Sequence, residues 1–104
     1  RVEALRTELT KCGVSVTEKG DTLHIEPGKL QGAEIETYRD HRLAMCFAVL
    51  GLSVPGMRLR DPACVRKTFP NFFQKLAAAP PEGVGAQIRD ASGALLAGDD
   101  LLAA

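Results

Sequence analysis

Apolar positions recur at helical spacing in the first dozen residues. Successive apolar residues lie three or four positions apart, which places them on one face of a helix: Val2, Leu5, Leu9 and Cys12. Lys11 and Gly13 provide the basic residue and the glycine that are common at helix C-termini. The pattern predicts an amphipathic helix over residues 1–12.

The next segments alternate between apolar and polar residues with a period of two. Residues 14–17 and 23–26 alternate in this way, and Glu-Lys-Gly-Asp at 18–21 separates them, which predicts a β-hairpin. Pro27-Gly28 ends the second strand. Residues 33–38 alternate weakly and are rich in residue types that favour strands, so a further short strand is expected there.

A second helix is predicted over residues 41–52, because Asp40 is a good N-cap and apolar residues follow at helical spacing. They are Leu43, Cys46, Phe47 and Leu50. We expect this helix to be largely buried, with Cys46 on its buried face. Both Cys46 and Cys64 are interpreted as packing residues, since neither has a histidine nearby in the sequence that would activate a nucleophile.

The remaining pattern predicts one strand and one short helix. Met57 and Leu59 alternate with arginines before Asp61 and Pro62 end the strand. Thr68 and Pro70 resemble a helix start. An apolar stripe follows at helical spacing: Phe69, Phe72, Phe73 and Leu76. The resulting order of elements predicts a mixed α/β fold.

Composition changes after this last helix. Residues 79–104 are rich in Ala, Gly, Pro and Asp and have no sustained period, so they are predicted to be an extension or linker with a weak helix near its end. Residues 1–78 form the predicted domain. The chain lacks an initiator Met and a signal peptide, and we interpret Arg1 as an internal residue of a longer protein.

Charge and cysteine content exclude several classes of function. The 13 basic residues balance the 13 acidic ones, so the global field expected of a nucleic-acid or membrane binder is absent. The longest apolar run, about ten residues, is too short to span a bilayer. Three widely spaced cysteines indicate neither a disulfide framework nor a metal site, and favour the cytoplasm. The glycines at 28 and 32 do not form a P-loop, and no cofactor is expected.

Candidate chemistry lies near the predicted helix starts. Arg42 in a first helical turn opposes the helix dipole, and an anionic ligand would remove the conflict. Lys67 precedes the last predicted helix, and Arg1 opens the first. Together these cations suit a small ligand with a carboxylate and a phosphate. Equally, Arg42 could form a surface ion pair with Asp40 or Glu36. His41, alone beside an N-cap, is interpreted as structural.

Two sequence blocks resemble a known family. Residues 37–47, which contain Asp-His-Arg, and residues 61–73, which contain Lys-Thr-Phe-Pro, closely resemble the end of EPSP synthases. Arg1 resembles the Arg of the family's Lys-Glu-Ser/Thr-Asp-Arg motif. The resemblance covers about residues 1–77. It implies the C-terminal part of an enolpyruvyl transferase domain built from βαβαββ repeats, in a protein that is a cytoplasmic monomer.

The resemblance also implies an activity. The family transfers the enolpyruvyl group of phosphoenolpyruvate to the 5-hydroxyl of shikimate 3-phosphate, and glyphosate inhibits it. Arg1, Arg42 and Lys67 match residues that bind phosphoenolpyruvate, and Lys67 is also catalytic. The family's acid/base Asp and Glu lie upstream of Arg1, so the chain alone is expected to be inactive. A non-enzymatic α/β module that binds a phosphorylated metabolite is the alternative, and an RNA-interaction domain has only the Phe residues in its favour.

Overall fold

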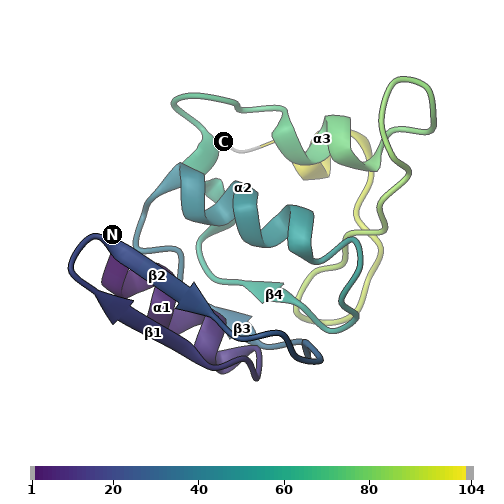
Figure 1. Cartoon of the computed structure of the whole chain (residues 1–104). Helices are drawn as coiled ribbons and strands as arrows, with labels where there is room; N and C mark the ends of the chain where they lie inside the picture. The colour runs from purple at the N-terminus through teal and green to yellow at the C-terminus, as the bar shows by residue number, and fades with distance from the viewer. Residues whose placement is uncertain (1, 103–104) are drawn as a thin grey trace.

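The computed structural model describes residues 2–102 and shows a mixed α/β fold, as the sequence predicts (Figure 1). Helix α2 runs through the middle, with α1 and the β1–β2 hairpin on one side and α3 on the other. The elements follow in the order α1 (Val2–Lys11), β1 (Val16–Lys19), β2 (Thr22–Ile25), β3 (Glu34–Ile35), α2 (His41–Leu50), β4 (Arg58–Leu59), η1 (Pro62–Val65), α3 (Phe72–Ala77) and η2 (Gly98–Leu101), where η marks a 3₁₀ helix.

The first helix and the hairpin confirm the predicted pattern. α1 ends at Lys11, and Gly13 follows it in a left-handed conformation with a φ of 90°, which glycine adopts readily. β1 and β2 pair antiparallel with Val16 opposite Ile25, and α1 packs against β1. Cys12, just after α1, is fully buried.

The other two strands are shorter than predicted and pair in parallel. Glu34 lies opposite Arg58, and the pairing continues at one end through a 2.8 Å bond from the Arg60 N–H to the Ile35 carbonyl. Gly32, just before β3, passes close to the turn that precedes β4. A Cβ at Gly32 would lie 2.3 Å from the carbonyl oxygen of Pro55, so only glycine permits this approach.

Two buried clusters lie on different faces of α2. The α1-side cluster consists of Cys12, Ile35, Leu43 and Phe47, and the α3-side cluster consists of Ala44, Val65, Phe73 and Leu101. The prediction that Cys46 lies on the buried face is wrong: Cys46 is exposed, as is Val49. Consecutive helical positions differ by about 100°, so the position next to Phe47 turns away from the core.

The last helix begins later than predicted. α3 starts at Phe72, not near Thr68 and Pro70, because residues 66–70 form turns. The Val65 carbonyl accepts bonds of 3.1 Å from the Thr68 N–H and 2.8 Å from the Phe69 N–H. These bonds form a turn that begins at Val65, and the α-helix starts only after it.

The C-terminal segment folds back onto the domain. Ile88, Leu96 and Leu101 pack in or against the α3-side cluster, and η2 lies where a weak helix is predicted. Whether residues 79–104 are an extension of the domain or a linker to another stays a prediction. Within residues 2–102, no helix has the length and apolar character required to cross a membrane.

Candidate functional site

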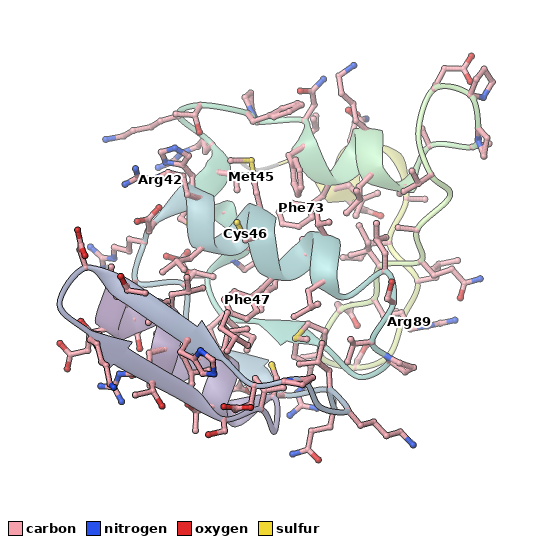
Figure 2. All side chains as sticks on the ribbon, in the orientation of Figure 1. Arg42, Met45, Cys46, Phe47, Phe73 and Arg89 are labelled. Carbon is pink, nitrogen blue, oxygen red and sulfur yellow. The ribbon has the colours of Figure 1, made fainter. Side chains whose placement is uncertain are left out.

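Arg42 lies at the N-terminal end of α2 (Figure 2), and its side chain bonds to Asp40, the residue that caps the helix. Asp40 Oδ1 accepts a 2.9 Å bond from the Arg42 N–H and a 3.3 Å bond from Arg42 Nε. The cap confirms the predicted helix start, and the ion pair with Asp40 is one of the alternatives left open by the sequence. The Arg42 side chain remains 54% exposed, so the guanidinium is still accessible to a ligand.

Strained backbone lies on both chain segments next to this helix end. Tyr38, Arg39 and Asp61 all have positive φ angles between 51° and 55°, which are costly for residues with a Cβ. The Thr37 hydroxyl, fully buried, donates a 2.8 Å bond to the Arg60 carbonyl and so joins the two segments. Strain of this kind persists where the surrounding structure fixes it, and it is common at functional sites.

A buried carboxylate anchors the segment before Arg42. Glu8 of α1 is fully buried and accepts bonds from Lys11 Nζ at 2.8 Å, the Tyr38 hydroxyl at 2.6 Å and the Glu36 N–H at 2.9 Å. Burial raises the pKa of Glu8, but these hydrogen bonds outweigh it, so the pKa lies below its ordinary value. The hydrogen bond from the Tyr38 hydroxyl to Glu8 raises the pKa of Tyr38 to about 12.

Sequence reasoning missed Glu8, although a signal was present. Glu8 follows Leu5 by three positions and precedes Cys12 by four, so it lies on the apolar face of α1. An acidic residue on such a face needs partners that satisfy it when it is buried. Lys11 is nearby in α1, but the other two partners, Glu36 and Tyr38, are distant in sequence, which is why spacing alone did not identify them.

Lys67 lies in the turn after η1 and is exposed. The expectation that it precedes a helix N-terminus is wrong, because α3 begins five residues later, at Phe72. Among residues 2–102, Lys67 makes no ion pair. Its ammonium group is therefore available to an anion.

The structure brings the segment that carries Lys67 close to α2. η1 packs against α2, and the charge of Asp40 contributes to the raised pKa of Cys64 in η1, for which burial is the main cause. Arg42 lies in α2 and the turn of Lys67 follows η1, so the two cations belong to segments that pack together. Arg1, the third predicted ligand, lies outside the described residues.

Four other candidate side chains are buried or partly buried: Cys12, Cys64, Phe73 and His41. Burial raises the pKa of both Cys12 and Cys64, which keeps their thiols protonated and supports a packing role for Cys64. Phe73 is buried between α3 and α2, and its ring meets that of Phe72 edge-on at 5.1 Å. His41 is partly buried as the first residue of α2.

Two hollows at the hairpin include neither Arg42 nor Lys67 in their lining. Two shallow hollows lie on the hairpin, one lined by residues that include Arg6 and Glu18 and the other by residues that include Lys19 and His24. Residues 2–102 contain no cluster of three or more metal-ligating side chains. Arg42 and Lys67 are both exposed, and they could form one wall of a site.

Comparison with known proteins relates this chain to one enzyme family. The profile of the family described as EPSP synthase (3-phosphoshikimate 1-carboxyvinyltransferase) matches residues 1–76. A protein named 3-phosphoshikimate 1-carboxyvinyltransferase from Nostoc punctiforme is 56% identical over 75 residues, which are 72% of this chain and 18% of the relative. The protein of the same name from Colwellia psychrerythraea is 50% identical over 78 residues, 74% of this chain and 18% of the relative.

The alignment covers only part of each relative. The chain spans about 18% of the length of the curated relatives it matches. The family profile ends at residue 76, within α3, and includes the positions of Arg42 and Lys67. Residues 77–104 therefore lie outside the match to the family profile.

Proposed function

This chain belongs to the EPSP synthase family, and we propose that it is the C-terminal part of an enzyme that transfers the enolpyruvyl group of phosphoenolpyruvate to the 5-hydroxyl of shikimate 3-phosphate. The observation that carries the proposal is the family match over residues 1–76, which includes the exposed Arg42 at the start of α2 and the exposed Lys67 in the turn after η1. We propose that the complete enzyme is a monomer in the cytoplasm.

Arg42 and Lys67 are assigned complementary roles in this proposal, with Arg1 as a third ligand. A guanidinium presents a planar fork that suits a carboxylate, whereas an ammonium is a compact, mobile charge that suits a phosphate. Arg42 would bind the carboxylate of phosphoenolpyruvate, and Lys67 its phosphate. The partial exposure of Arg42 and the lack of an ion pair at Lys67 within residues 2–102 support these assignments.

The reaction explains why cations are required. The 5-hydroxyl oxygen bonds to the enol carbon while the methylene carbon takes a proton, and the tetrahedral intermediate then loses its phosphate and a proton to form the new enol ether. Lys67 would stabilise the negative charge that grows on the departing phosphate. Proton transfer would use acidic groups from another part of the enzyme, so the chain alone is expected to be inactive.

The test is phosphate release by the complete protein. Inorganic phosphate should appear from phosphoenolpyruvate only when shikimate 3-phosphate is present, and glyphosate should compete with phosphoenolpyruvate. Absence of release with both substrates would overturn the proposal. Binding of phosphoenolpyruvate without any release would instead favour the non-enzymatic module.

A further inference from the structure

Leu101 connects the C-terminal segment to the elements that carry the proposed ligands. Its side chain is 6% exposed and belongs to the α3-side cluster with Ala44, Val65 and Phe73. Ala44 lies two positions after Arg42 on α2, and Val65 lies two positions before Lys67. Leu101 itself lies 25 residues beyond the family match, which ends at residue 76. The cluster therefore includes a side chain from outside the matched region.

The route to this cluster begins with hydrogen bonds at the end of α3. The Leu76 carbonyl accepts a 3.1 Å bond from the Ala86 N–H, and the Ala78 carbonyl accepts a 2.8 Å bond from the Gly85 N–H. Such carbonyls have no partner within a helix, so the segment satisfies them. A Cβ at Gly83 would lie 2.0 Å from the Lys75 carbonyl oxygen, so the segment fits here because residue 83 is a glycine.

A tight reversal then returns the chain to α3. The Ile88 carbonyl accepts a 2.8 Å bond from the Leu96 N–H, and both side chains pack against the α3-side cluster. At the tip, Asp90 Oδ1 accepts bonds from the Ser92 and Ala94 N–H groups, which fixes the turn. The chain then reaches η2, which packs against α3 and ends in Leu101. The trace in Figure 1 follows this return beneath α3.

Val65 couples the cluster to the turn of Lys67. Its side chain is fully buried, and its carbonyl accepts the Thr68 and Phe69 N–H groups that close the turn. A shift of Val65 would therefore move the backbone on both sides of Lys67. Ala44 belongs to the same cluster and lies in α2, two positions after Arg42, so the cluster also contacts the helix that carries Arg42.

We propose that Leu101 is a positioning residue, which holds the turn of Lys67 at a fixed place relative to Arg42 and so tunes the affinity for phosphoenolpyruvate. The inference rests on the proposed function, because it concerns the same two cations. It goes beyond that function by assigning a role in the site to residues 79–102, which the family profile does not match. Leu101 acts through Val65 and does not touch substrate.

The test is Leu101→Ala in the complete protein, with Leu102→Ala as the matched control. Leu102 is the adjacent leucine but is 42% exposed. Loss of the Leu101 side chain should raise KM for phosphoenolpyruvate about tenfold, because misplacement of a binding group weakens binding strongly. KM for shikimate 3-phosphate should stay within about twofold, and Leu101→Met, which conserves volume, should restore wild-type values.

Hydrogen exchange separates this inference from the proposed function. The amides of Thr68 and Phe69 should exchange faster in Leu101→Ala and not in Leu102→Ala, whether or not substrate is present. Unchanged exchange and unchanged KM in an active enzyme would overturn the role of Leu101 alone. An equal rise in both KM values, or a fall in kcat with no change in KM, would also overturn it. Wild-type protein that releases no phosphate would overturn the proposed function, and exchange would still decide whether Leu101 holds the turn.

Discussion

The hydroxyl of Tyr38 donates a 2.6 Å hydrogen bond to Oε2 of Glu8, a carboxylate that is fully buried. Tyr38 has a φ of 55° and lies four positions before Arg42, whereas Glu8 belongs to α1. The bond therefore ties a strained segment beside the proposed ligand site to a helix far away in the sequence. Its strength should affect the stability of the whole fold.

Tyr38→Phe removes this bond without changing the shape of the ring. The free energy of unfolding should fall by about 1–3 kcal/mol, because a buried charged acceptor loses a donor. Urea denaturation of the complete protein measures the change. Thr10→Ala is the control, since it removes an exposed hydroxyl bond to the Arg6 carbonyl; it should change stability by less than about 0.5 kcal/mol. Equal losses in both variants would contradict the prediction.

Acid should weaken the fold through Glu8. Its pKa is lowered in the folded protein, so the carboxylate stabilises the fold above the ordinary value of 4.5, and this contribution is lost as the pH falls through the folded pKa. Urea midpoints measured from neutral pH to about pH 3 should therefore drop in the wild type. In Glu8→Gln the midpoint should be lower at neutral pH and should drop less in acid. Parallel curves for the two proteins would exclude Glu8 as the group responsible.

Local sequence patterns correctly predicted the elements whose formation depends on residues nearby in the sequence. α1, the hairpin and the Asp40 cap follow from spacing, a turn and one polar side chain, all within a few residues. The start of α3 was predicted too early because Thr68 and Pro70 satisfy a local rule. The Val65 carbonyl accepts the competing N–H groups, and Val65 is held by tertiary packing.

The parts of the site that sequence did not reveal depend on distant contacts. Arg42 was predicted to be a ligand from its helix position and from the family resemblance, which stays a prediction, and its ion pair with Asp40 was only one of the alternatives. Leu101 lies in a segment without hydrophobic period, and its burial comes from α2, η1 and α3. Spacing within a segment cannot report such contacts, because they join residues that periodicity treats as unrelated.

Gly32→Ala should destabilise the approach between the start of β3 and the turn before β4. The new Cβ would lie 2.3 Å from the Pro55 carbonyl oxygen and 2.5 Å from the carbonyl carbon of Gly56, and backbone cannot move aside easily. The free energy of unfolding should fall by about 1–3 kcal/mol, as in other overpacked sites. Gly28→Ala is the control, since its Cβ would meet only Val14 Cγ1 at 3.8 Å. A Gly32→Ala protein as stable as Gly28→Ala would contradict the observed approach.

Arg42→Ala and Lys67→Ala test the proposed grip on phosphoenolpyruvate directly. Each should lower kcat/KM for this substrate by an amount equivalent to about 2–5 kcal/mol, because a charged ligand loses its partner. Arg42→Lys should restore little if the guanidinium fork binds a carboxylate. The measurement is steady-state phosphate release by the complete enzyme at varied phosphoenolpyruvate.

Matched cations elsewhere separate this effect from a general loss of positive charge. Arg58 on β4 and Lys75 on α3 are exposed, and neither makes an ion pair with residues 2–102. Arg58→Ala and Lys75→Ala should keep kcat/KM within about threefold of wild type, since distant exposed charges are screened by salt. The comparison is informative only if urea denaturation shows all four alanine variants to be folded. Near-normal kinetics in Arg42→Ala and Lys67→Ala would show that the anion binds elsewhere in the enzyme.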